Sequence, residues 1–198
     1  MKKIYNSLLI ILMLIIDSIY LYNSIANQNG HRLATYLALP LVLLLPLLYE
    51  KIVKKPLKDE LKVIYYSFIF IADALGCVVG LYEKIGWFDI FSHYLSGVVT
   101  ACVGIIILND WKIKEKPFQV IILCLAITCF VAVFWEIFEF SVDNIAGMNL
   151  QHSIDTGVRD TMEDMIAAII GSISFLGIYF ITATNGIFHK FLNNLTIK

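Results

Sequence analysis

The sequence has little net charge, few cysteines and no long polar stretch. It has 15 lysine and arginine residues and 16 acidic residues, so the formal net charge is -1. No basic surface is therefore available to displace the counterions of a nucleic acid. The four cysteines stand singly in apolar runs without Cys-x-x-Cys spacing, which indicates neither a disulfide framework nor a zinc ribbon. We also find no internal repeat and no segment polar and long enough for a separate soluble domain.

The sequence is rich in long apolar runs. Of its 198 residues, 59% are hydrophobic and 16% are charged, and the mean hydropathy is +0.79. A helix needs about 20 apolar residues to cross the hydrocarbon of a bilayer. Six runs are close to that length, at about 4–24, 33–50, 62–82, 88–108, 118–145 and 161–182. We predict an all-α polytopic membrane protein with six transmembrane helices in one bundle, forming a single transmembrane domain over residues 1–198.

The first span has two interpretations. The start Met-Lys-Lys, followed by an apolar run, resembles a signal peptide with a passable cleavage site at residues 24–26. We expect a retained anchor instead, because bulky apolar residues from Ile19 to Ile25 continue the helix past Asp17.

Proline and glycine predict local features of the other spans. Pro40 and Pro46 lie inside the second span and should kink it, since proline removes a helical hydrogen bond. Small residues let helix backbones approach each other in a membrane. We therefore expect close packing between helices at Gly76, Gly80, Gly97, Gly104 and Gly171.

The distribution of basic residues predicts the orientation of the chain. If the N-terminus is cytoplasmic, the outer loops contain three basic residues, Arg32, Lys84 and Arg159. The other twelve fall on the cytoplasmic side: Lys2, Lys3, Lys51, Lys54, Lys55, Lys58, Lys62, Lys112, Lys114, Lys116, Lys190 and Lys198. The positive-inside rule requires such a bias. We predict a multi-pass protein of the cytoplasmic (inner) membrane with both termini in the cytoplasm.

Acidic residues gather at the predicted outer ends of three spans. Asp89 and His93 lie in the first turns of the fourth span and, four residues apart, share a helical face. Glu136, Glu139 and Asp143 form one stripe in the last turns of the fifth span. The sixth span and the loop before it add Asp155, Asp160, Glu163 and Asp164. Ionised groups at membrane depth are costly, and like carboxylates repel unless a proton or cation intervenes, so the cluster predicts a cation-binding site.

The ligand types favour a hard divalent ion. We predict a metal site with the ligands Asp89, His93, Glu139, Asp143, Asp160 and Asp164. Oxygen-rich shells with few imidazoles suit Mg²⁺ or Mn²⁺, with Ca²⁺ a further option. Iron is less favoured, because the Glu-x-x-His motifs of di-iron bundles are absent. Further candidates are Asp155, Glu163 and His152. For Asp155, Asp160 and Glu163, stabilisation of the N-terminal turn of a helix or exposure at a wet interface is an equally adequate explanation.

Three motifs in this part of the chain resemble a known family. They are Trp87-Phe-Asp89-Ile-Phe-Ser-His93-Tyr-Leu-Ser-Gly97, Glu136-x-x-Glu139-x-x-x-Asp143 and Asp155-Thr-x-x-x-Asp160-Thr-x-x-Asp164-Met-x-x-Ala-x-x-Gly171. In this order and spacing they resemble the YjdF-type family of bacterial integral membrane proteins and, more distantly, the VanZ-like superfamily. The match covers about residues 60–182. Tyr94 is a mild departure, since these families often have Phe there.

The resemblance implies an integral membrane protein and a polar signature, but no reaction. The residues that match this signature are Asp89, His93, Glu136, Glu139, Asp160 and Asp164. Gly97 and Gly171 match as packing positions. VanZ-like proteins are associated with glycopeptide resistance, and neither family has an assigned catalytic residue that would carry over to this chain.

Three functions stay open at this point. A metal-dependent enzyme would act at the outer leaflet on a lipid or lipid-linked envelope substrate, with Glu136 as the candidate catalytic base. A proton- or cation-coupled transporter or ion relay would use the same acids, and Asp17 and Asp73, deeper in the first and third spans, favour it. A non-catalytic membrane protein would bind a cationic or glycopeptide ligand. A Gly-x-Ser-x-Gly motif is absent, so a nucleophilic serine has little support.

Overall fold

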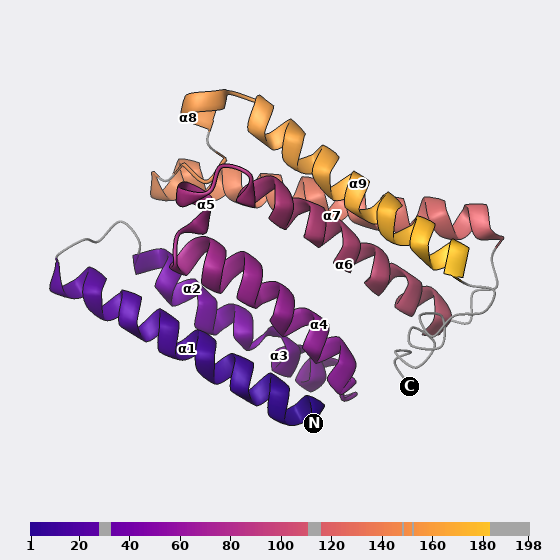
Figure 1. Cartoon of the computed structure of the whole chain (residues 1–198), viewed down its shortest axis with the longest axis horizontal. Coiled ribbons are helices and arrows are strands. Elements are labelled where there is room, and N and C mark those ends of the chain that lie inside the picture. Colours follow the sequence, from indigo (N-terminus) through magenta and orange to yellow (C-terminus); the bar gives the residue numbers. More distant parts are fainter. Residues whose placement is uncertain (28–32, 111–115, 148, 152, 183–198) are drawn as a thin grey trace. The chain divides into compact units, whose positions relative to one another are not determined.

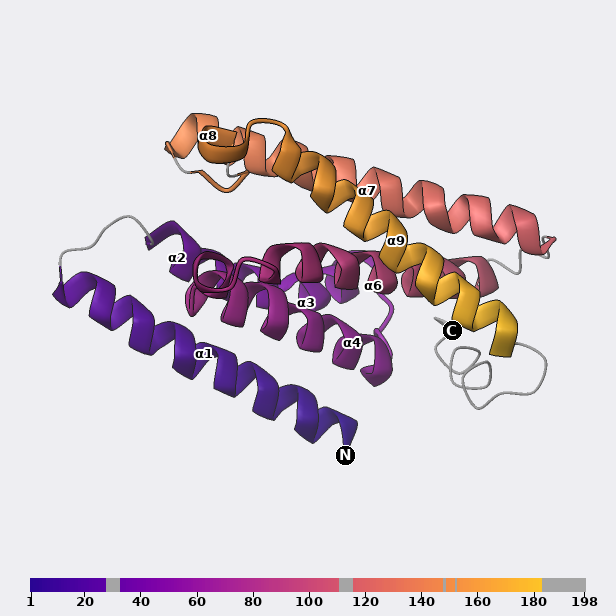
Figure 2. The ribbon, with the colours of Figure 1, turned by 45° about the horizontal axis from the view of Figure 1, so that its top comes forward.

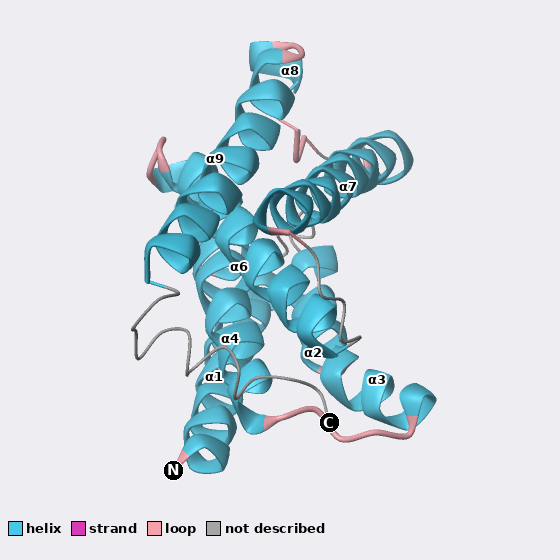
Figure 3. Ribbon diagram, turned by 90° about the vertical axis from the view of Figure 1, so that its right-hand side faces the viewer, coloured by secondary structure: helices cyan, strands magenta, loops and turns pink. Residues whose placement is uncertain are grey.

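The structure of the protein is a computed structural model that describes residues 1–27, 33–110, 116–147, 149–151 and 153–182. Within these ranges the regular structure is helical, without strands (Figure 3). Six helices are long and apolar enough to cross a membrane: Lys2–Ala26, Thr35–Val53, Asp59–Val78, Phe88–Leu108, Pro117–Ile145 and Arg159–Thr182. The prediction of an all-α protein with six candidate spans is therefore confirmed. The predicted orientation of the termini stays a prediction.

The helices form two compact units, Met1–Phe88 and Asp89–Lys198. The first unit contains α1 (Lys2–Ala26), α2 (Leu33–Leu43), α3 (Leu45–Val53), α4 (Asp59–Ile69), the π-helix η2 (Phe70–Val78) and α5 (Leu81–Lys84). The second contains α6 (Phe88–Asp110), α7 (Pro117–Ala146), α8 (Ser153–Thr156) and α9 (Arg159–Thr182). A single domain over the whole chain stays a prediction.

In the first unit, α1 packs along α2, α4 and η2 (Figure 1). The side chains between these helices are apolar and almost fully buried, including Met13, Leu39, Ala74 and Val78. Large apolar residues cover the outside of α1, among them Leu8 and Ile19. This arrangement is expected of a helix group whose outer surface faces lipid tails.

The second span is interrupted, and proline explains where. The chain breaks at Leu44, between α2 and α3, and Pro46 stands in the first turn of α3. Proline has no N–H to donate to the carbonyl four residues earlier, which here belongs to Val42. The hydroxyl of Tyr65 on α4 donates to that carbonyl instead, at 2.6 Å. The predicted kink is confirmed at Pro46, whereas Pro40 lies inside the continuous α2.

The third span ends earlier than the predicted residue 82. Its second half is the π-helix η2, in which Val79 N–H closes the last turn by donating to the carbonyl of Ala74 at 3.0 Å. The chain then turns at Gly80, whose φ of 79° lies in the left-handed region that favours glycine. Gly80 is also buried, and its expected close-packing role stays a prediction. Gly76 is a close-packing position, since a Cβ there would overlap the ring of Tyr82.

In the second unit, α7 and α9 lie side by side (Figure 2). α6 and α9 approach so closely that a Cβ on Gly97 would overlap the carbonyl oxygen of Ala168, and a Cβ on Gly171 would overlap that of Tyr94. The close-packing roles expected for these two glycines are confirmed. At such contacts, small residues allow backbones to approach within van der Waals distance.

A layer of hydroxyl groups joins the three long helices of the second unit. Oγ1 of Thr128 on α7 lies 3.1 Å from Oγ1 of Thr100 on α6 and 3.1 Å from Oγ of Ser172 on α9. Thr128 and Ser172 are almost fully buried. Hydrogen bonds between side chains of different helices are a main source of helix association in membranes.

Candidate functional site

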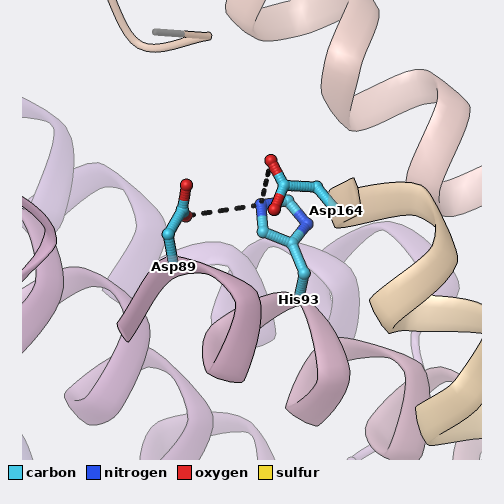
Figure 4. A group of neighbouring side chains, drawn as sticks. All are labelled: Asp89, His93 and Asp164. Atoms are coloured by element: carbon cyan, nitrogen blue, oxygen red, sulfur yellow. Dashed lines mark ion pairs between the residues drawn. The ribbon is translucent and has the colours of Figure 1, made fainter. Parts of the chain in front are cut away.

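Three side chains converge at one end of the second unit: Asp89 and His93 from α6, and Asp164 from α9 (Figure 4). Nε2 of His93 lies 3.6 Å from Oδ1 of Asp89 and 3.7 Å from Oδ2 of Asp164. One oxygen or nitrogen from each side chain lies within 4.8 Å of the others. His93 and Asp164 are buried, whereas Asp89 is half-buried.

These separations suit a shared ion better than direct hydrogen bonds. At 3.6 and 3.7 Å, the pairs exceed the length of an N–H···O hydrogen bond. An octahedral ion with bonds of about 2.1 Å keeps neighbouring ligands roughly 3 Å apart and opposite ligands roughly 4 Å apart. The two separations from His93 therefore fall within the range expected of ligands around one cation.

Helix geometry explains why these residues meet. Asp89 lies in the first turn of α6, and His93 follows four residues later on the same face. Gly97 and Ala168 each lie four residues beyond the site, on the faces of His93 and Asp164. Because α6 and α9 touch at Gly97 and Ala168, the side chains one turn away are held close together.

Glu136 and Glu139 bring further negative charge from α7. Both are buried, with 6% and 9% of their surface exposed. The charge of Asp89 acts on both of them, and that of Asp164 acts on Glu139. Oε1 of Glu139 accepts a hydrogen bond from the indole Nε1 of Trp135 at 2.8 Å. The acidic stripe predicted on this helix therefore lies near the Asp89–His93–Asp164 group.

Asp143, at the end of the same stripe, holds the loop after α7. Its two carboxylate oxygens accept hydrogen bonds from the backbone N–H groups of Leu150 at 2.6 Å and Gln151 at 3.0 Å. Backbone hydrogen bonds thus account for this carboxylate without an ion. Its predicted role as a metal ligand stays a prediction.

The acids at the start of α9 divide into two groups. Asp160 is half-buried, and its charge acts on Glu136 and Asp164. Glu163 accepts a hydrogen bond at 2.7 Å from Nε of Arg159, a largely exposed side chain. An exposed ion pair of this kind explains Glu163 without a ligand role.

The remaining candidates lie outside this group. Asp155 is in α8, but its side chain is outside the described part of the structure, and His152 lies outside the described residues. Asp17 and Asp73 belong to the first unit, on α1 and η2. Asp17 is buried, and its Oδ1 has no hydrogen-bond partner among the described residues. Its charge acts on Asp73, so these two acids form a separate pair.

Sequence reasoning missed three neighbours of the site. Trp135 precedes Glu139 by four residues, so helical spacing was a signal that could have found it. Gln151 donates through Nε2 to the main-chain carbonyl of Glu136 and to Oγ1 of Thr161, both at 3.3 Å. No pattern in the sequence indicates that this loop residue folds back between α7 and α9.

The described part of the site is rich in carboxylates and poor in compensating positive charge. Desolvated carboxylates near one another are costly unless they share protons or bind a cation. Carboxylate oxygens with one imidazole are the ligands of hard divalent ions. The side chains best placed to hold such an ion are Asp89, His93 and Asp164.

Comparisons with known proteins agree with a membrane location. The family model described as "Predicted membrane protein (DUF2238)" matches residues 7–185. An "Uncharacterized protein" from Thermotoga maritima is 27% identical over 146 residues, which cover 73% of this chain and 74% of that protein. No solved structure matches.

Proposed function

The chain belongs to the family described as "Predicted membrane protein (DUF2238)", and on this premise we propose that it is a metal-dependent enzyme acting on a lipid or lipid-linked envelope substrate. The observation that carries the proposal is the convergence of Asp89, His93 and Asp164 from two helices that are long and apolar enough to span a membrane. A buried ionisable group in such a helix is by default a functional site. A site of this kind lies within reach of lipid headgroups.

The chemistry follows from the residues around the site. Asp89, His93 and Asp164 would hold a divalent ion, which supplies a Lewis acid for a phosphoryl or carbonyl oxygen. Glu136 is the candidate base, because it is buried near this group and no hydrogen bond reaches either of its carboxylate oxygens within the described residues. An oxygen that is not already engaged is available to accept a proton from water.

The test compares the full chain with two site variants. Detergent-purified wild type should contain a stoichiometric divalent ion and should convert a component of a bacterial envelope lipid extract, followed by mass spectrometry. His93→Ala and Asp164→Asn should lose both the ion and the conversion. Glu163→Gln is a matched control, since Glu163 lies in an exposed ion pair. An ion-free wild type that leaves every lipid unchanged contradicts the proposal.

A proton- or cation-coupled transporter is the second candidate. It is favoured by the buried carboxylate of Asp17, which acts on Asp73 in the π-helix η2. π-Helical segments are frequent at functional sites. If Asp17→Asn and Asp73→Asn abolish ion flux in proteoliposomes while metal content stays intact, transport replaces the enzyme. Ligand binding by a metal-free, inactive wild type would instead favour the non-catalytic binding protein.

The orientation and location of the chain belong to the same proposal. The lysine bias supports cytoplasmic N- and C-termini in the cytoplasmic membrane. With this orientation, Asp89, His93 and Asp164 lie near the outer face, where a lipid-linked envelope substrate is accessible. The distant VanZ-like resemblance is compatible with an envelope substrate and stays a prediction.

A further inference from the structure

We propose that the site holds two divalent cations rather than one, with Asp164 as the carboxylate that bridges them. The first ion would lie among Asp89, His93 and Oδ2 of Asp164. The second would lie on the other side of Asp164, between its Oδ1 and Glu136. This inference rests on the proposed function, because it needs the first ion.

The two oxygens of Asp164 have different surroundings. Oδ2 lies 3.7 Å from Nε2 of His93. Oδ1 is buried and has no hydrogen-bond partner among the described residues. Only 2% of the Asp164 surface is exposed, so water from bulk solvent does not satisfy this oxygen. A buried oxygen without a hydrogen-bond partner or ion destabilises the folded protein. A single ion at Oδ2 leaves Oδ1 without such a partner.

Glu136 supplies the second observation. It is 6% exposed, and within the described residues no hydrogen bond reaches Oε1 or Oε2. The side chains of Thr161 and Gln151 are close enough to act on its carboxylate. The Gln151 amide donates to Thr161 Oγ1 and to the main-chain carbonyl of Glu136, both at 3.3 Å. Glu136 is thus a carboxylate with two buried oxygens available for ligation.

The charges place Glu136 and Asp164 around a common region. Glu136 and Asp160 both act on Asp164, and Asp89 and Asp160 act on Glu136. Each of these four carboxylates is negatively charged when ionised. One divalent ion neutralises half of their combined charge, and two ions neutralise all of it. Arg159, the basic residue adjacent to Asp160 in the sequence, pairs with the half-buried Glu163.

Glu139 is less suitable for the second position, because Oε1 already accepts the Trp135 hydrogen bond.

Two ions that share a carboxylate typically stand about 3.5–4 Å apart, a separation that suits two oxygens of one phosphoryl group. Of the two substrate oxygens considered above, the paired site therefore favours the phosphoryl oxygen. One oxygen of Glu136 would bind the second ion, and the other stays available to accept a proton.

The test counts Mn²⁺ ions on the full-length protein in detergent. Wild type stripped with a chelator and dialysed against Mn²⁺ should bind two ions per chain, with an electron paramagnetic resonance spectrum of a spin-coupled pair. Glu136→Gln, which keeps the shape of the side chain, should bind one ion with an uncoupled spectrum. The control Glu163→Gln should still bind two ions.

Each alternative result is decisive. One uncoupled ion on the wild type overturns the second position and leaves the proposed function standing, whereas no ion overturns both. Two coupled ions on a monodisperse Glu136→Gln variant overturn the role of Glu136. The wild-type count decides the proposal even if Glu136→Gln fails to fold.

Discussion

At the scale of single residues, the distance between His93 and Asp164 depends on glycine. The close contact of Gly97 with the backbone of Ala168 lies one helical turn from both side chains. A second contact, between Gly171 and the backbone of Tyr94, holds the same pair of helices. Backbone contacts of this kind are rigid, because no flexible side chain can move aside.

We predict that Gly97→Ala separates the two halves of the site. The added Cβ overlaps the Ala168 carbonyl oxygen, and overpacking of this kind costs about 1–3 kcal/mol. A thermal-shift assay should show lower stability, and Mn²⁺ affinity should fall at least about tenfold, because the ligands of α6 and α9 move apart. Gly177→Ala is the matched control, since its Cβ would meet no atom of the described residues within 4 Å. Equal Mn²⁺ affinity in Gly97→Ala and wild type would contradict this role.

Helical spacing predicted the residues that converge but not the partners of each carboxylate. Asp89 and His93 share a face by their i, i+4 spacing, and the structure brings Asp164 to them. Asp143 lies on the same stripe as Glu136 and Glu139, yet its oxygens bind loop N–H groups. Those partners come from a loop that turns back, and no periodic pattern describes such a loop.

At the scale of the helices, interhelical hydroxyl groups hold α6, α7 and α9 together. Thr128 is the central member, within 3.1 Å of both Thr100 and Ser172. Gly104 adds a close contact to the same region, since a Cβ there would lie 3.0 Å from Sγ of Cys124 on α7. The polar site at one end of the unit is therefore built on helices that pack tightly against each other.

We expect Thr128→Val to loosen this helix group without changing its shape. Valine keeps the volume of threonine but removes both interhelical contacts, each worth about 0.6 kcal/mol in a membrane. Unfolding in mixed detergent should show a loss of roughly 1 kcal/mol. Ser174→Ala is the control, because the Ser174 hydroxyl donates only to Ile170 of its own helix. A loss no larger than that of the control would show that the hydroxyl layer contributes little.

The breaks in the helices were only partly predictable. Proline predicted the interruption at Pro46, because a missing N–H is a property of the residue itself. The Tyr65 hydroxyl that satisfies Val42 comes from another helix, so its position depends on packing. The π-helix Phe70–Val78 adds residues to a turn without a proline or other local signal. The end of the third span was predicted too late, because the chain turns at Gly80 while the apolar composition continues beyond it.

At the scale of the whole molecule, hydrophobic length was enough to predict the spans. The described helices reproduce the six predicted ranges to within a few residues at most ends. Length and composition are summed over about 20 residues, so single exceptions have little effect. The division into two compact units was not predicted, because it depends on contacts between helices far apart in sequence.

The proposed orientation predicts which side of the membrane each loop occupies. Val158 and Lys55 are exposed and lie in different connections. A membrane-impermeant maleimide should label Val158→Cys in intact cells whose outer envelope admits the reagent. It should label Lys55→Cys only after lysis, because lysine-rich loops stay in the cytoplasm. The protein without an added cysteine gives the background from its four native cysteines. Labelling of Lys55→Cys in intact cells would reverse the orientation.

The central claim is that Asp89, His93 and Asp164 surround a bound divalent ion. The most direct measurement is a crystal structure of the full chain grown with Mn²⁺, using anomalous diffraction to locate the metal. The account predicts an anomalous peak in contact with Nε2 of His93 and with a carboxylate oxygen of each of the two aspartates. A structure at saturating Mn²⁺ with no peak there, or with the three side chains facing different surroundings, would contradict it.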